Sequence, residues 1–149
     1  MHVRDAVSSR YSCRAFLPTP IPEATIRDIV ERAARAPSAG NMQPWRIYAI
    51  AGKRVEQLKA LLTPRMATEL PKGEGADYTI YPEPLTEPYR TRRFQVGEAL
   101  YRSIDIPRQD KTARYRQYAR KYQFFGAPVA LFFAREKVHG LAQWADIGG

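Results

Sequence analysis

Arg10, Ser12 and Arg14 place two guanidinium groups around a hydroxyl near the start of the chain. In an extended backbone alternate side chains point to one side, so these three are spaced to meet a single ligand. Guanidinium groups bind phosphate through paired, charge-assisted hydrogen bonds, and the short hydroxyl adds one more donor. The spacing therefore indicates a phosphate-binding site. A solvated basic turn is the alternative that the spacing leaves open.

A second polar group occupies the stretch from Pro37 to Trp45. Ser38, Asn41 and Gln43 offer hydroxyl and amide groups, which donate and accept hydrogen bonds without carrying charge. Such groups can bind the edge of a heterocyclic ring, and Trp45 then enters the following strand as an apolar anchor. A helix-to-strand loop without a ligand is the alternative here, because Asn is common in turns.

Two strands and one amphipathic helix must position these groups. Strands are predicted at residues 46–51, with Ile47 and Ile50 buried, and at residues 128–134. The second strand is a continuous apolar run, typical of a central strand covered on both faces. A helix is predicted to start after Pro22 and to stop before Pro37. Its apolar stripe consists of Ile26, Ile29, Val30, Ala33 and Ala34.

The remaining chain is predicted to be mostly helical. Residues 63–88 hold five prolines and two glycines and are expected to be irregular. Two strands are few for an α/β sheet, and no internal repeat is present. The other predicted helices lie at residues 3–9, 53–62, 94–104, 109–123 and 140–149, with a break at Pro107.

Composition limits the class of protein. The 149 residues, 44% hydrophobic and 26% charged, are typical of one globular domain. No apolar stretch approaches the ~18 residues of a membrane span, and the N-terminus lacks an apolar signal core. Cys13 is the single cysteine, which excludes an internal disulfide or a zinc framework and leaves no His nearby in sequence as its base. These features favour a cytoplasmic protein with no membrane partner and no metal.

The chain is strongly basic, with 24 Lys and Arg against 15 Asp and Glu and a net charge of +9. Ten basic and three acidic residues fall between Arg90 and Lys121, so that window alone carries +7. Such an excess favours an anionic partner: a nucleic acid, a membrane surface or a phosphorylated cofactor.

A tyrosine stripe in the basic window supports a nucleic-acid partner. Tyr115, Tyr118 and Tyr122 lie on one helical face, and Arg116 and Arg120 lie on another. Aromatic rings beside cations can stack on single-stranded bases while neutralising phosphates. The alternative is a packed stripe flanked by a solvated basic face, because an amphipathic helix needs this pattern in order to pack.

Taken together, the two polar motifs resemble the nitroreductase family of flavin enzymes. Residues 10–14 are similar to the family's N-terminal FMN-phosphate motif, and residues 36–45 are similar to its second signature. Residues 125–128, ahead of the apolar strand, also fit. Residues 143–148 look like the start of the family's long central helix. The resemblance covers the whole chain, which is therefore identified as one nitroreductase-like domain over residues 1–149.

The resemblance implies an α+β fold with a central, mainly antiparallel sheet flanked by helices. It implies an FMN-dependent oxidoreductase that reduces nitroaromatic or quinone-type substrates with NAD(P)H, ping-pong fashion, by hydride transfer through flavin N5. No residue is then assigned a catalytic role, because the chemistry belongs to the flavin. The stretch from Tyr81 to Arg93 is similar to the branch that reduces nitrobenzoate-type aromatics.

The family also implies a homodimer with FMN at the interface and a small aromatic substrate, and neither a nucleic acid nor a membrane as partner. Tyr11 stands where the family more often has Arg or His. The cofactor-binding residues implied are Arg10, Tyr11, Ser12 and Arg14 from one subunit and Pro37, Ser38, Asn41 and Gln43 from the other.

Two rival functions remain open at this point: a cofactor-free protein that binds single-stranded nucleic acid, and a flavin-binding module without reductase activity. Family members continue for about another half-domain. The chain is therefore expected to lack the C-terminal part, and to aggregate or to unfold with poor cooperativity when expressed alone. The reason is the strand at residues 129–133, which is strongly apolar and needs cover on both faces.

Overall fold

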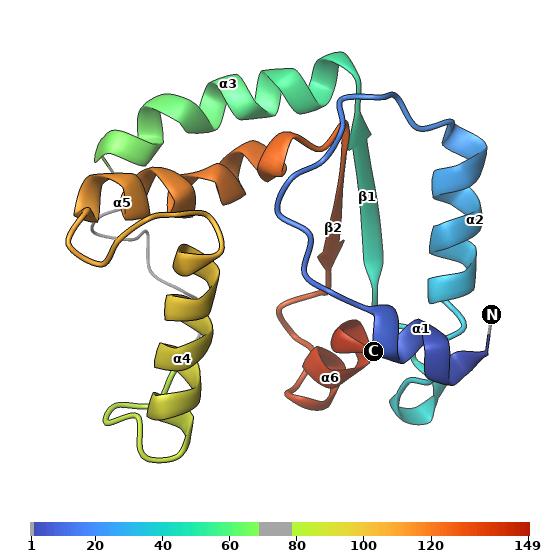
Figure 1. Cartoon of the computed structure of the whole chain (residues 1–149). Helices are drawn as coiled ribbons and strands as arrows, with labels where there is room; N and C mark the ends of the chain where they lie inside the picture. The colour runs from blue at the N-terminus through green and yellow to red at the C-terminus, as the bar shows by residue number, and fades with distance from the viewer. Residues whose placement is uncertain (1, 69–78) are drawn as a thin grey trace. The chain divides into compact units, whose positions relative to one another are not determined.

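The structure, a computed structural model, describes residues 2–68 and 79–149 (Figure 1). The chain divides into two compact units: unit 1 comprises Met1–Leu58 and Gly126–Gly149, and unit 2 comprises Lys59–Phe125. The elements are α1 (Val3–Ser9), α2 (Glu23–Ala33), the 3₁₀ turn η1 (Ala39–Asn41), β1 (Arg46–Ala51), α3 (Lys53–Thr68), α4 (Tyr89–Arg102), α5 (Lys111–Ala119), the 3₁₀ segment η2 (Arg120–Gly126), β2 (Val129–Ala134) and α6 (Ala142–Gly148).

Unit 1 is built on a two-stranded antiparallel sheet in which β1 pairs with β2. The register places Arg46 opposite Ala134 and Ala51 opposite Val129. Both predicted strands are confirmed, and β2 starts one residue late because Pro128 has no N–H to donate to the ladder. Helices and an antiparallel sheet together confirm the predicted α+β class.

The covering of the sheet differs from the prediction. Ile47 and Ile50 are half-buried rather than buried, and Phe132 and Phe133 on β2 are 38% and 45% exposed. These two phenylalanines lie on opposite faces, because successive side chains alternate along a strand. Among the described residues β2 therefore pairs only with β1 and has neither face fully covered, so the expected doubly covered central strand is wrong for this structure.

Helix α2 lies alongside β1 within unit 1 (Figure 1). Ile26 and Val30 of its predicted stripe are half-buried, whereas Ile29 is 49% exposed. A groove of about 420 Å³ runs between the helix and the sheet, lined in part by Ile26, Val30 and Ile47. The stripe therefore faces the sheet as predicted, over a contact that is not closely packed. The helix ends at Ala33, ahead of Pro37, as expected.

Few of the described side chains are buried. A single buried residue, Ala119, lies on a helix of unit 2. The buried residues of unit 1 are Pro44, Val55, Ala127, Ala130 and Gln143. Pro44 and Ala127 each lie two residues before a strand, Ala130 lies on β2, and Gln143 lies on α6. The buried residues of unit 1 are therefore concentrated around the sheet and α6.

The helices of unit 2 differ from their predicted limits. Helix α4 starts at Tyr89 rather than at residue 94, because Glu87 supports its first turn. The Glu87 carboxylate accepts a hydrogen bond from the backbone N–H of Thr91 at 3.3 Å and one from Arg90 Nε at 2.7 Å. These bonds hold the pKa of Glu87 below its ordinary value. The expected break at Pro107 is confirmed, and α5 ends at Ala119 before the 3₁₀ segment η2.

Helix α3 continues to Thr68, so the predicted end at residue 62 is wrong. Pro64 lies inside the helix, where it removes one backbone hydrogen bond. Side chains support the turn just before it. Thr63 Oγ1 donates to the Lys59 carbonyl at 2.8 Å, and Gln123 Nε2 donates to the same carbonyl at 3.3 Å. The predicted irregular structure is thus confirmed for residues 79–88. The prediction is wrong for residues 63–68, which are helical, and the rest of the segment lies outside the described residues.

Two negative findings concern the described ranges, residues 2–68 and 79–149. None of their helices has both the length and the apolar character needed to cross a bilayer. No three His, Cys, Asp or Glu side chains in these ranges gather closely enough to hold a metal ion.

Candidate functional site

The first predicted motif follows α1 in a segment without regular secondary structure. Arg10 closes the helix in an extended conformation, with φ −65° and ψ 129°. Arg14 Nη1 donates to the Ser12 carbonyl at 3.1 Å, which folds that guanidinium back along its own segment. Tyr11 is 77% exposed. None of the ion pairs between described residues engages Arg10 or Arg14, so both positive charges remain available to an anion.

The second predicted motif forms a tight turn between α2 and β1. Gly40, Asn41 and Gln43 adopt left-handed backbone conformations with φ of 58°, 55° and 48°. Such conformations are sparsely populated by residues other than glycine and gather at binding sites. Ser38 Oγ accepts a hydrogen bond from the Gln43 backbone N–H at 2.9 Å, and Asn41 Oδ1 accepts one from Gln43 Nε2 at 2.9 Å. The three predicted polar residues of this turn are therefore brought together.

Helix α6 holds this turn from a distant part of the sequence. Asp146 Oδ1 accepts a hydrogen bond from the Ala39 backbone N–H at 3.1 Å, and its Oδ2 is buried without a partner. Gln143 Nε2, from the same helix, lies 3.7 Å from Met42 Sδ. Sequence reasoning placed residues 143–148 on a helix but assigned Asp146 no role. The sequence around Asp146 does not indicate that its carboxylate binds a backbone N–H in a distant turn.

The two motifs remain separate within unit 1. Figure 1 shows that α1, the turn after α2, and α6 lie at the end of the sheet where β1 begins and β2 ends. No hydrogen bond or ion pair between described residues joins Arg10, Ser12 or Arg14 to Ser38, Asn41 or Gln43. Pro37 is exposed at the start of the turn. Trp45, the predicted anchor, is half-buried, and Pro44 beside it is buried.

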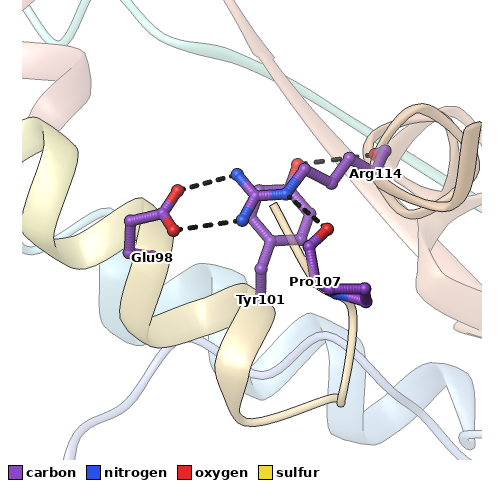
Figure 2. Close-up of polar contacts among 4 residues, drawn as sticks. All are labelled: Glu98, Tyr101, Pro107 and Arg114. Carbon is purple, nitrogen blue, oxygen red and sulfur yellow. Dashed lines mark hydrogen bonds and ion pairs between the residues drawn. The ribbon is translucent and has the colours of Figure 1, made fainter. Parts of the chain in front are cut away.

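Unit 2 contains a polar cluster that sequence reasoning counted only as charges (Figure 2). Arg114 Nη1 and Nη2 donate to the two carboxylate oxygens of Glu98 at 2.7 and 3.2 Å. Arg114 Nε donates to the Pro107 carbonyl at 3.3 Å, and the guanidinium lies 4.2 Å from the Tyr101 ring centroid. These bonds hold the pKa of Glu98 below its ordinary value and raise that of Arg114. The cluster ties α4 to α5 through Arg114, which contacts each of the other three residues.

The tyrosine stripe of α5 and η2 also makes contacts within unit 2. Tyr115 donates its hydroxyl to the Met66 carbonyl. Tyr118 and Tyr122 meet edge to face, with ring centroids 6.4 Å apart, and Lys121 Nζ lies 3.5 Å from the Tyr118 centroid. The hydrogen bond with Lys121 lowers the pKa of Tyr118. These contacts favour a tyrosine stripe that packs within unit 2 over one whose rings stack on nucleic-acid bases. Tyr118 is nevertheless 49% exposed.

Comparison with known proteins identifies the class to which this fold and these motifs belong. The Nitroreductase family model matches residues 7–148, and the chain therefore belongs to the nitroreductase family. It is similar to the nitrobenzene nitroreductase of Ectopseudomonas oleovorans, with 37% identity over 97% of this chain and 62% of that protein. It is also similar to the 4-nitrobenzoate reductase of Pseudomonas putida, with 37% identity over 95% of this chain and 61% of that protein.

Solved structures agree with the family. The FMN and NADPH-dependent nitroreductase NfnB of Sphigopyxis sp. strain HMH superposes with a TM-score of 0.91 at 40% identity, over 99% of this chain and 66% of that one. NfnB of Mycobacterium smegmatis, solved in complex with NADPH, superposes with a TM-score of 0.88 at 26% identity. The match covers 97% of this chain and 64% of that one. The fold prediction is thereby confirmed. The chain spans about 62% of the length of the curated relatives it matches first.

Proposed function

We propose that this chain acts in an FMN-dependent oxidoreductase that reduces nitroaromatic or quinone-type substrates with NAD(P)H. Relatives named for nitrobenzene and 4-nitrobenzoate, and the structures described as FMN and NADPH-dependent, support the proposal. In the chain itself, the observation that carries it is the pair Arg10 and Arg14, whose charges no described carboxylate neutralises.

The donor groups of the two motifs fit such a cofactor. Two guanidinium groups and the Ser12 hydroxyl match the phosphate end of FMN. In the second motif, the hydrogen bonds to Gln43 use one acceptor each from Ser38 and Asn41. The Ser38 hydroxyl proton and the Asn41 amide N–H groups are left for the polar edge of a ring. We therefore assign the phosphate and ribityl oxygens to Arg10, Ser12 and Arg14, with Tyr11 beside them in the cofactor-binding set. We assign the flavin ring to Pro37, Ser38, Asn41 and Gln43.

When bound, FMN supplies the hydride transfer between NAD(P)H and the acceptor. The protein's part in the proposal is binding and orientation, so an acid–base pair is not required of it. Asp146 fixes the backbone of the turn that carries Ser38 and Asn41, and so positions their side chains.

The proposal includes a cytoplasmic homodimer with FMN at the interface between its subunits. The family resemblance of the two motifs supports this arrangement, because it implies that they reach the flavin from different subunits. In this homodimer, the first motif of one protomer and the second motif of its partner bind the same FMN.

The test is purification of the protein followed by FMN titration, with loss of flavin fluorescence as the readout, and then NADPH oxidation with and without nitrobenzene. Saturable FMN binding and nitrobenzene-dependent NADPH oxidation are expected. Flavin binding without NADPH oxidation would show a flavin-binding module instead. Binding of single-stranded oligonucleotides with no affinity for FMN would identify the nucleic-acid-binding alternative.

A further inference from the structure

A charged pocket in unit 2 is lined by α4, α5 and the loop that joins them. Its volume is about 460 Å³, within the ~300–1,000 Å³ typical of small-molecule sites. The charged residues that line it are Glu98, Arg102, Asp105, Arg108 and Arg114. All of them belong to unit 2, so this unit alone forms the pocket.

Only two of these charges neutralise each other. Arg114 and Glu98 form the paired hydrogen bonds of Figure 2, and their side chains are 17% and 25% exposed. No described carboxylate forms an ion pair with Arg102 or Arg108. Once Glu98 is matched with Arg114, the pocket keeps two positive charges and one negative charge. It therefore favours a ligand that is negative overall.

The guanidinium groups of Arg102 and Arg108 act on the same part of the pocket. The hydrogen bond from Arg114 does most to lower the pKa of Glu98, and the charges of Arg108 and Arg102 add to the effect. Both charges are thus close enough to influence one carboxylate. No described group accepts a hydrogen bond from either side chain, so their N–H groups are available to an anion. Phosphate is the anion that guanidinium groups bind through paired, charge-assisted hydrogen bonds.

The unpaired acid of the pocket, Asp105, lies where local preferences favour other residues. Its φ is 54°, and its backbone N–H donates to the Arg102 carbonyl at 3.2 Å. The backbone N–H of Ile106 donates to the Tyr101 carbonyl at 2.9 Å. These two bonds close α4 in a motif whose left-handed position is usually glycine. A carboxylate is also unfavourable at the negative end of a helix. The helix ending therefore does not account for Asp105, whose carboxylate is free to accept hydrogen bonds from a ligand.

We propose that this pocket binds a sugar phosphate, with the phosphate at Arg102 and Arg108 and a sugar hydroxyl donating to Asp105. The phosphate matches the two unpaired guanidinium groups. The sugar hydroxyls match the carboxylate, which repels a second anionic group. A free sugar phosphate and the ribose phosphate of a nucleotide share this chemistry. The proposal concerns unit 2 alone and does not rest on the FMN-dependent function.

Isothermal titration calorimetry with ribose 5-phosphate, inorganic phosphate and ribose tests the proposal. Ribose 5-phosphate is expected to bind, and inorganic phosphate is expected to bind about tenfold more weakly, because it cannot offer sugar hydroxyls to Asp105. Ribose alone, without a charge, is expected not to bind measurably. Equal affinities for the two phosphates, or no binding of ribose 5-phosphate, would overturn the proposal. Tighter binding of adenosine 2′-monophosphate than of ribose 5-phosphate would identify a nucleotide as the source, and weaker or equal binding a free sugar phosphate.

Substitutions locate the bound phosphate. Arg102→Gln and Arg108→Gln are each expected to raise the dissociation constant of ribose 5-phosphate about tenfold or more, since a charge-assisted contact is lost. Asp105→Gly suits the left-handed backbone and removes only the carboxylate. It is expected to tighten the binding of inorganic phosphate and to abolish the advantage of ribose 5-phosphate over it. A preference for ribose 5-phosphate that survives Asp105→Gly would contradict the role assigned to Asp105.

Two controls separate this pocket from other positive charges. Arg116→Gln is the matched control, because Arg116 is exposed on α5 and does not line the pocket. Equal weakening by Arg116→Gln and Arg102→Gln would show general electrostatic attraction and overturn the proposal. The double variant Arg10→Ala/Arg14→Ala is expected to bind ribose 5-phosphate as the unaltered protein does, even where it no longer binds FMN. Loss of ribose 5-phosphate binding in that variant would place the ligand at the first motif and overturn the proposal.

Discussion

The Asp146 carboxylate accepts a hydrogen bond from the backbone N–H of Ala39, which lies 107 positions earlier in the chain. Ala39 begins the 3₁₀ turn that carries Asn41, and Asp146 lies on α6. A turn with three left-handed residues is unfavourable without outside support. The carboxylate supplies that support from the opposite end of the sequence.

Replacing Asp146 by alanine is therefore expected to loosen the turn. The lost hydrogen bond is worth about 1 kcal/mol of unfolding free energy. Urea denaturation measures it, and Asp146→Asn is the matched variant, because it keeps an acceptor oxygen for Ala39. Equal stability of Asp146→Ala and the unaltered protein would show that the bond does not hold the turn.

Removing the guanidinium groups of the first motif is expected to weaken FMN binding. Each charge-assisted contact contributes about 1.5–3 kcal/mol, so Arg10→Ala and Arg14→Ala are each expected to raise the FMN dissociation constant tenfold or more. Fluorescence titration gives the constants. Arg35→Ala, at an exposed arginine outside both motifs, controls for general charge loss. An unchanged constant in the double variant would refute the phosphate assignment.

The dimer arrangement predicts complementation between subunits. At an FMN concentration that loads the unaltered protein but not the variants, chains with Asn41→Ala and chains with Arg14→Ala are expected to have little activity alone. In a random mixture half of the dimers are mixed, and each mixed dimer holds one intact site, so about a quarter of normal activity should return. NADPH oxidation after mixing and refolding measures the recovery. A mixture as inactive as its parents would mean that both motifs serve a flavin on their own chain.

The ion pair between Glu98 and Arg114 predicts a pH dependence of stability. Arg114 holds the pKa of Glu98 below its ordinary value of 4.5 in the folded protein. The pair therefore contributes fully above about pH 4.5, and its contribution is lost as the pH falls through the folded-state pKa. Urea unfolding over a series of acid pH values is expected to show a shallower acid decline in Glu98→Gln than in the unaltered protein. The exposed Glu31, changed to Gln, should leave the decline as it is.

Two glycines are expected to respond in opposite directions to alanine. Gly126, ahead of β2, has φ +84°, and an added Cβ would lie 3.5 Å from the Phe16 carbonyl oxygen. Gly126→Ala is expected to cost about 1–2 kcal/mol of unfolding free energy. Gly97 lies inside α4 with open space around it, so Gly97→Ala is expected to gain about 0.5–1 kcal/mol. Thermal unfolding compares the two, and a loss in both would contradict the backbone argument.

The sequence predicted correctly the elements whose limits depend on residues within the element itself. The strand at residues 46–51 is confirmed at both ends, because a short apolar run with flanking Pro and Gly marks it. Helix α4 was predicted five residues short, since Tyr89 to Arg93 have no apolar period and their turn depends on the Glu87 side chain. Helix α3 passes Pro64 because Gln123 supports the preceding turn across a long separation in sequence.

In the candidate site, too, the features with a local cause were predicted and the contacts between distant residues were missed. Residue types alone predicted the polar set Ser38, Asn41 and Gln43, and the structure joins them by hydrogen bonds. The Asp146 contact was missed because it links residues that only the folded chain brings together. The contact between Arg93 and Tyr81 was missed for a different reason. Tyr81 was assigned to the irregular, proline-rich segment and Arg93 was counted only as a charge, and neither pattern predicts which ring an arginine will contact.

The register of the sheet has an evolutionary consequence. Ala51 and Val129 are paired, so the chain leaves the sheet at one residue and returns at its direct neighbour. A segment whose ends lie about 5 Å apart can be lengthened, shortened or exchanged at little cost, because loop closure depends weakly on length. Recombination between related genes within residues 59–125 can therefore replace unit 2 while the buried Val55 and Ala127 and the motifs at residues 10–14 and 37–43 are inherited unchanged. The segment inserted between the two strands and the part of the chain that holds the two motifs can thus diversify at different rates.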